Sequence, residues 1–259
     1  MLAAVAFDLS DNVAYVAAGL LAGLAIGLTG MGGGVVLTPI MVVGLGVPAN
    51  VAVGNDLIVS LLVKPIGARV HGKAGTVRRD IVRCLVIGSV PAAFLGAMIV
   101  GLWLDTGDSL EVIIGIALLV SASMMVVRML IRSHGEGPSP LHPIPTMAVG
   151  IVGGLLVGIT SVGSGSLMLV LLTWIYPRLA SKTLVGTDLM QAIPLVASAA
   201  LGHLIFGDIR FSIVLPVLLG AAPGVYFGSR ASSRMPNWAL RPVLILLVGA
   251  SGLRLVGVF

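Results

Sequence analysis

Two short clusters rich in glycine are the parts of this sequence best suited to hold an anion. They read Thr29-Gly30-Met31-Gly32-Gly33-Gly34 and Thr160-Ser161-Val162-Gly163-Ser164-Gly165-Ser166. A helix that restarts after such a cluster points free N–H groups and the positive end of its dipole at the break, which suits an anion. The predicted anion-binding residues in the clusters are Gly32, Gly33, Gly34, Gly163, Ser164, Gly165 and Ser166. The alternative is that these glycines only allow helices to pack closely.

Asp56 and Asp188 stand at equivalent positions in the apolar segments that follow the two clusters. A carboxylate inside a bilayer is expensive enough to suggest a role in proton or cation coupling. Both residues also lie near the predicted starts of their helices, where an acid could cap the helix or complement its dipole. On the same segments, Asn55, Thr187 and Gln191 could donate hydrogen bonds to an oxyanion or bond between helices. Asn55 and Gln191 are included in the predicted binding site.

Lys64 lies in the apolar run DLIVSLLVKPIGARV, next to Pro65. A buried ammonium at this position could be the counter-charge of a bound anion, and we include it in the predicted site. The alternative is that Lys64 extends toward the nearby basic loop and the membrane surface. His71 and His203 match each other in the two halves of the chain, and we interpret both as turn residues rather than proton carriers.

The composition indicates that this chain is embedded in a lipid bilayer. Of its 259 residues, 58% are hydrophobic and only 10% are charged, against roughly 25% charged residues in a soluble domain. The mean hydropathy is +1.13. The basic residues stand in short loops between apolar stretches, so we predict membrane topology rather than nucleic-acid binding as their cause. The sequence shows no catalytic, dinucleotide-binding or metal-ligand pattern, and we expect no enzyme activity, cofactor or metal.

Eight apolar stretches can be read against the roughly 20 residues that cross a bilayer. They cover residues 13–46, 49–68, 84–104, 110–131, 144–176, 183–206, 211–229 and 238–256. An unbroken helix over 13–46 would measure on the order of 50 Å, well beyond a hydrocarbon core of about 30 Å. The two glycine-rich clusters stand in the middle of the two longest stretches. We therefore predict that both helices break there.

The chain contains an internal repeat of roughly 130 residues. An offset of 131 aligns Gly27, Thr29, Gly32 and Gly34 with Gly158, Thr160, Gly163 and Gly165. An offset of 132 then aligns VGNDL, starting at Val53, with VGTDL, starting at Val185. It also aligns Gly88, Pro91 and Gly96 with Gly220, Pro223 and Gly228. We predict a first membrane repeat over 1–132, a cytoplasmic linker rich in proline and glycine over 133–145, and a second membrane repeat over 146–259.

The distribution of charge favours inverted rather than parallel repeats. If each long stretch folds back as a hairpin, twelve of the fifteen Lys and Arg residues fall on one side of the membrane. If each stretch crosses once, five of them move to the other side: Arg178, Lys182, Arg230, Arg234 and Arg241. The positive-inside rule favours the hairpins, with both termini outside. The expected fold is an all-α polytopic membrane protein of two inverted repeats, each a glycine-broken helical hairpin plus three transmembrane helices.

The doubled motif resembles a known transporter family. Its two copies read GLTGMGGGVVLTPI and GITSVGSGSLMLVL, and each is followed by G-[NT]-D-L. This pattern is similar to that of the TauE/SafE sulfite exporter family, also called the toluene sulfonate uptake permeases. The resemblance implies transport of sulfur-containing anions such as sulfite, sulfonates or sulfoacetate across a bacterial or archaeal inner membrane.

The sequence therefore predicts a secondary transporter that binds a small anion between the two glycine-rich breaks while the halves rock around it. The expected partners are a small anionic substrate and the lipid bilayer. A membrane scaffold or assembly factor without transport and an anion channel are the alternatives. The coupling ion, the direction of transport and the oligomeric state, a homodimer included, stay open at this stage.

Overall fold

A computed structural model describes residues 9–29, 33–73, 75–103, 108–130, 137, 139–231 and 237–258 of the chain. Every regular element in these residues is helical, and none of them forms a strand. The elements are α1 (Leu9–Thr29), η1 (Gly33–Val35), α2 (Leu37–Pro39), η2 (Ile40–Gly44), α3 (Ala49–Lys73), α4 (Arg79–Trp103), α5 (Asp108–Leu130), α6 (Pro143–Thr160), α7 (Leu167–Ile175), α8 (Ser181–Phe206), α9 (Phe211–Ala231) and α10 (Asn237–Leu255). The predicted all-α class is confirmed.

The helices are long and apolar enough for a multi-pass membrane protein. Within the described part of the chain, five stretches qualify as membrane-crossing by length and composition. They are Arg79–Trp103, Ser109–Leu130, Pro143–Thr160, Ser181–Phe206 and Phe211–Gly228. Shorter apolar helical stretches cover Asn12–Leu28, Gly33–Gly44 and Pro242–Leu255. The predicted polytopic helical architecture agrees with these spans, and α6 begins at Pro143, inside the segment predicted as linker.

Both long apolar stretches are broken at the glycine-rich clusters, as predicted. In the first, α1 ends at Thr29 and the next helical turn begins at Gly33. In the second, α6 ends at Thr160 and α7 begins at Leu167. Gly163 and Gly165 between them have φ angles of 121° and 97°, a region that glycine enters without the steric penalty of a Cβ. These glycines therefore allow the chain to turn.

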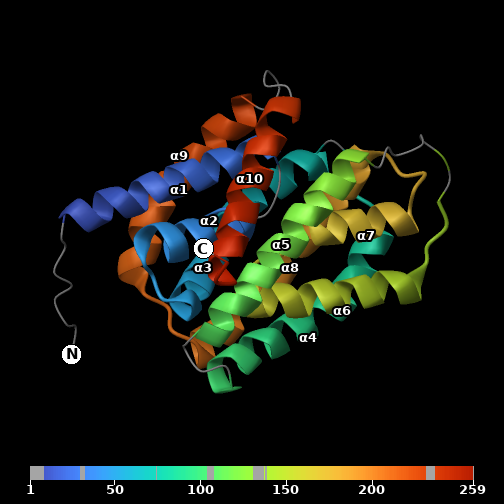
Figure 1. Cartoon of the computed structure of the whole chain (residues 1–259). Coiled ribbons are helices and arrows are strands. Elements are labelled where there is room, and N and C mark those ends of the chain that lie inside the picture. The colour runs from blue at the N-terminus through green and yellow to red at the C-terminus, as the bar shows by residue number, and fades with distance from the viewer. Residues whose placement is uncertain are drawn as a thin grey trace.

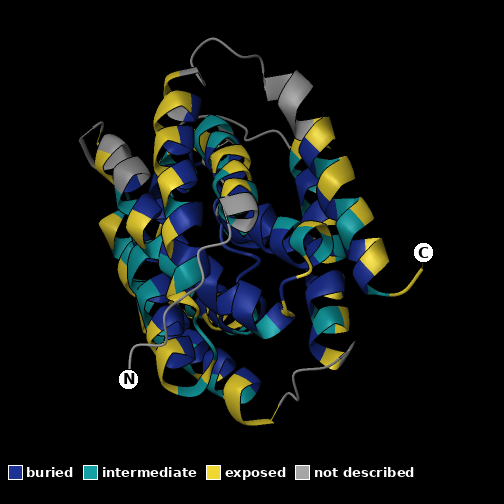
Figure 2. Ribbon diagram, turned by 90° about the vertical axis from the view of Figure 1, so that its left-hand side faces the viewer, coloured by how far each residue is buried: buried dark blue, intermediate teal, exposed yellow. Residues whose placement is uncertain are grey.

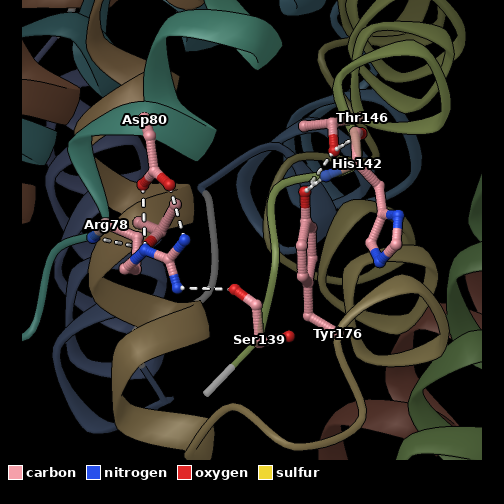
Figure 3. Close-up of polar contacts among 7 residues, drawn as sticks. Arg78, Asp80, Ser139, His142, Thr146 and Tyr176 are labelled. Carbon is pink, nitrogen blue, oxygen red and sulfur yellow. Dashed lines mark hydrogen bonds and ion pairs between the residues drawn. The ribbon is translucent and has the colours of Figure 1, made fainter.

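The second long stretch folds back on itself. The Tyr176 hydroxyl, directly after α7, lies 2.7 Å from the hydroxyl of Thr146 in the first turn of α6. The backbone N–H of His142 donates to the same Tyr176 oxygen at 3.1 Å (Figure 3). Tyr176 is fully buried. The end of α7 therefore lies beside the start of α6, with the break at the far end of the hairpin.

Glycines bring helices from the two sequence repeats into close contact. α1 packs along α9, and α4 packs along α6 (Figure 1). A Cβ on Gly23 of α1 would overlap the backbone oxygen of Ala221 in α9. A Cβ on Gly158 of α6 would overlap the backbone oxygen of Ala93 in α4. For these glycines, which lie outside the two breaks, close packing is their role.

The interior of the bundle contains charged and polar side chains among the apolar ones. Figure 2 shows buried residues filling the centre and exposed residues on the outward faces of the helices. Leu37, Leu57 and Leu195 are fully buried. The buried polar set on α3 and α8 is Asn55, Asp56, Ser60, Lys64, Thr187, Asp188, Gln191 and His203. Because charge is expensive in a bilayer, this concentration on two adjacent helices marks the candidate site.

We predict that Gly158→Ala destabilises the protein by about 1–3 kcal/mol, because the added methyl overpacks the contact between α6 and α4. The control is Gly249→Ala in α10, where a Cβ would meet no atom within 4 Å. We expect this change to be neutral or stabilising by up to about 1 kcal/mol through helix propensity. Thermal unfolding of the purified protein in detergent measures both. Equal shifts in the two variants would contradict the packing role of Gly158.

Candidate functional site

The two glycine-rich breaks meet inside the protein. Gly34 of the first break lies directly against the backbone of Ser161 in the second, and a Cβ on Gly34 would overlap the Ser161 carbonyl oxygen. A Cβ on Gly33 would lie 2.8 Å from the Ser60 hydroxyl and 3.2 Å from a carboxylate oxygen of Asp56. Both positions therefore need glycine for this approach. Gly32, which we also predicted in the site, lies outside the described residues.

Asp56 stands at this meeting point, fully buried. Its carboxylate accepts hydrogen bonds from Thr38 Oγ1 at 3.4 Å and from Ser60 Oγ at 3.5 Å. The Ser161 hydroxyl donates to the same carboxylate. The three donors come from α2, α3 and the second break, so one carboxylate connects the second glycine-rich cluster to two helices that follow the first. Hydrogen bonds to an ionised acceptor are among the stronger ones in proteins.

Lys64 points into the protein rather than toward the membrane surface. It is 6% exposed, and its Nζ donates to Ser164 Oγ at 2.8 Å. The predicted alternative of an extended, surface-seeking Lys64 is therefore wrong. The charges of Asp188 and Asp56 both act on this ammonium. No ion pair of 4 Å or less joins them among the described residues, so Lys64 keeps donor capacity beyond Ser164.

Asp188 and Gln191 form a second polar group on α8. Gln191 Nε2 donates to Asp188 Oδ1 at 3.0 Å and lies 3.0 Å from the sulfur of Met168 in α7. The hydroxyl of Ser89 in α4 donates to Gln191 Oε1 at 3.3 Å. Gln191 therefore connects three helices around the carboxylate.

The two aspartates do not cap their helices. α3 begins at Ala49 and α8 at Ser181, and neither helix has an acid in its first turn. Asp56 and Asp188 each lie roughly two turns further along. The cap interpretation is therefore wrong for both, because each aspartate lies too far into its helix to reach the free N–H groups of the first turn.

Asn55 and Thr187, the residues before the two aspartates, make matching contacts. The backbone N–H of Arg210, just before α9, donates to Asn55 Oδ1 at 2.9 Å. The backbone N–H of Arg78, just before α4, donates to Thr187 Oγ1 at 3.1 Å. Both side chains thus bond between helical segments, which was one of the two predicted roles. The Asn55 Nδ2 atom is buried and has no partner among the described residues.

Arg78 is also held by its side chain, as Figure 3 shows. Its Nε donates to Asp80 at 2.9 Å and its Nη1 donates to the carbonyl oxygen of Ser139 at 3.3 Å. The hydrogen bond that Arg78 donates to Asp80 raises the pKa of Arg78 above its usual value, so the side chain stays a cation. The segment before α6 is therefore attached to the start of α4.

Ser166 and His203 have no hydrogen bond to Asp56, Lys64 or Asp188 in the part of the chain that the structure describes. Ser166 is 1% exposed, and its hydroxyl has no partner among the described residues. His203 is fully buried in the last turn of α8, with Nε2 2.8 Å from the carbonyl oxygen of Gly158. The interpretation of His203 as a turn residue is therefore wrong. The side chain of His71 lies outside the described residues.

Four hydroxyl residues of the site were missed from the sequence: Thr38, Ser60, Ser89 and Ser161. A signal existed for two of them. Ser60 follows Asp56 by one helical turn, a spacing at which side chains meet, and Ser161 belongs to the second cluster. Thr38 and Ser89 come from other helices and reach the site only through tertiary packing.

Comparison with known proteins places this geometry in a family. Residues 15–255 match the family described as Sulfite exporter TauE/SafE. The probable membrane transporter protein YjnA of Bacillus subtilis (strain 168) is 34% identical over 255 residues, covering 95% of this chain and 100% of its own length. The probable membrane transporter protein YdhB of the same organism is 26% identical over 241 residues, with 91% and 96% covered. No solved structure matches this chain.

The family match covers nearly the whole chain, including both breaks and the helices that carry the buried charges. The similarity to YjnA is just as extensive. The chain belongs to the sulfite exporter TauE/SafE family of membrane transporters.

Proposed function

We propose that this transporter moves a small sulfur-containing anion, of the sulfite, sulfonate or sulfoacetate class, across the bacterial inner membrane by alternating access. The substrate class follows the family description, which names sulfite. The observation that carries the proposal is the buried ammonium of Lys64, hydrogen-bonded to Ser164 where the two breaks meet. A buried cation with donor capacity to spare, set among hydroxyl groups, suits an oxyanion.

The proposed binding residues come from both glycine-rich clusters and from the helices that follow them. They are Gly32, Gly33, Gly34, Asn55, Lys64, Gly163, Ser164, Gly165, Ser166 and Gln191. The hydroxyl of Ser166 and the amide nitrogen of Asn55 have no partner among the described residues, and they are buried donors that a ligand could satisfy. Asp56 and Asp188 are the proposed ion-coupling residues, since a buried carboxylate that changes its charge can tie a proton or cation to the movement of the substrate.

Inverted repeats would let this site open to each side in turn. Two matching hydrogen bonds support that arrangement, from Arg78 N to Thr187 and from Arg210 N to Asn55. The sequence offset of 132 that aligns Asn55 with Thr187 also aligns Arg78 with Arg210. Each repeat therefore reaches across to the other through the equivalent contact. In the proposed topology these contacts close opposite sides of the site, with the Arg78 side cytoplasmic and both termini outside.

Transport by reconstituted vesicles tests the anion site. We expect saturable uptake of sulfite or an organosulfonate by the wild type, and a loss of about tenfold or more in Lys64→Met, because a hydrogen bond to a charged group contributes roughly 1.5–3 kcal/mol. The matched control is Lys182→Met, which removes an exposed lysine at the start of α8. It should transport like the wild type.

Three outcomes would count against the proposal. If neither anion moves nor thermally stabilises the wild type, the anion-transport function is wrong. If Lys64→Met transports normally, the site is elsewhere. Flux that rises without saturation would indicate a channel.

The matching hydrogen bonds give a test of alternating access. Thr187→Val and Asn55→Leu each remove one hydrogen-bond acceptor, worth about 0.5–1.5 kcal/mol. Each change should shift the equilibrium between the state open to the cytoplasm and the state open to the opposite side by roughly twofold to tenfold. A Ser166→Cys reporter in a Cys84→Ala background is labelled by an impermeant maleimide from either side of sealed vesicles. We expect Thr187→Val to raise labelling from the cytoplasmic side and Asn55→Leu from the opposite side.

The control for this test is Thr173→Val. It removes a hydroxyl that bonds only within α7, to Leu169 O at 2.6 Å, and should leave labelling unchanged. If Thr187→Val and Asn55→Leu raise labelling from the same side, the halves are not inverted.

A further inference from the structure

The surroundings of Asp56 have the features of an anion-binding site that is already filled. Three hydroxyl groups, from Thr38, Ser60 and Ser161, donate to its carboxylate. They belong to α2, α3 and the second break, so elements far apart in sequence converge on this one group. A carboxylate and a substrate oxyanion both accept hydrogen bonds and donate none. These hydroxyls are therefore the donors that a bound anion would also need.

There is little room for an anion beside the ionised carboxylate. The Cα of Gly33 lies so near that an added Cβ would stand 3.2 Å from Asp56 Oδ1 and 2.8 Å from Ser60 Oγ. Gly34 closes on the Ser161 backbone next to it. The ionised Asp56 carboxylate and a substrate anion therefore compete for the same hydroxyl donors.

The charges around Asp56 also disfavour the binding of a further anion. The charged group that acts on Asp56 is Lys64 on α3. Asp188 on α8 also acts on Lys64, and Asp188 is itself acted on by Lys64 and by Arg128 on α5. The partners from α2 and from the second break are uncharged hydroxyls. With Asp56, Asp188, Lys64 and Arg128 all ionised, the two negative and two positive charges balance. An added anion would leave one uncompensated negative charge in a buried site, which is unfavourable.

A proton on Asp56 removes both obstacles. The neutral carboxyl group is a weaker acceptor for the three hydroxyls and gains one O–H that can itself donate to the anion. It also returns the group of charges with its bound anion to overall neutrality. The proton comes from water on the side to which the site is open, and it leaves with the anion on the other side.

We propose that Asp56 is an internal anion that occupies the substrate's hydrogen-bond donors, and that the transporter carries one proton on Asp56 together with each anion. This inference rests on the anion-transport function proposed above and specifies its coupling as symport. Because linkage is reciprocal, the proton and the anion must each raise the affinity for the other.

The pH dependence of anion binding tests this coupling. Toluenesulfonate is a suitable probe, because it stays ionised throughout the neutral range. We expect its affinity for the wild type to rise as the pH falls, by up to about tenfold per pH unit for one linked proton. Asp56→Asn mimics the protonated carboxyl group and should bind the probe with an affinity that does not change with pH. Glu111→Gln, an acid on α5 outside the site, should keep the wild-type slope.

Two further measurements use the same proteins. When the probe is added to wild-type protein in weak buffer, the protein should take up one proton for each anion that binds. This measurement does not require any variant to fold. In vesicles, an acid-outside pH gradient should drive the wild type to accumulate the probe. Asp56→Asn should lose this accumulation and keep exchange of labelled for unlabelled probe.

The outcomes separate the two proposals. Probe binding by the wild type with no pH dependence and no proton uptake would overturn the role of Asp56 and leave the anion site standing. A slope that persists in Asp56→Asn would assign the proton to another group, Lys64 or Asp188, and would also overturn it. Wild-type protein that binds neither toluenesulfonate nor sulfite at any pH would overturn the anion-transport function and this coupling with it.

Discussion

A backbone that leaves its helix at membrane depth must find hydrogen-bond partners inside the protein, and this constraint organises the whole molecule. The second break satisfies part of the requirement locally: Val162 N donates to Thr160 Oγ1 at 3.1 Å, and Ser161 N donates to Val157 O at 2.8 Å. The remaining polar surface is buried where Gly34 meets Ser161. Because the breaks cover each other, the charges on α3 and α8 can lie beside them without contact with lipid.

Glycine serves two different purposes in this fold, and the distinction explains why the sequence pattern allowed two interpretations. On α1 and α6, Gly23 and Gly158 sit inside regular helices and let α9 and α4 come close. At the breaks, Gly163 and Gly165 adopt positive φ angles, and Gly34 admits the backbone of the other half. The first purpose holds the repeats together, and the second lets the two breaks meet next to the buried polar groups.

Much of the fold could be predicted from the sequence because hydrophobic length and glycine runs act locally. The apolar stretches and both breaks lie where the pattern indicated. The cap interpretation of Asp56 and Asp188 failed, because both aspartates lie about two turns beyond the helix starts at Ala49 and Ser181 and cannot reach the free N–H groups of the first turn. The orientation of the Lys64 side chain could not be predicted from the sequence either, because its partner Ser164 is a hundred residues away in the chain. Such contacts depend on packing alone.

The repeats have diverged where the charges lie, and this divergence gives the two aspartates different surroundings. In the register that aligns Asp56 with Asp188, Lys64 corresponds to Val196 and Ser60 to Ala192, while Gln191 corresponds to Val59. Asp56 is therefore held by hydroxyls that a ligand could take over, whereas the amide of Gln191 holds Asp188 and the charge of Lys64 acts on it. The ammonium comes from the first half and its serine partner from the second. This hydrogen bond therefore joins the two halves. In the proposed function an anion bound at the breaks contacts both halves, and their relative movement changes its surroundings.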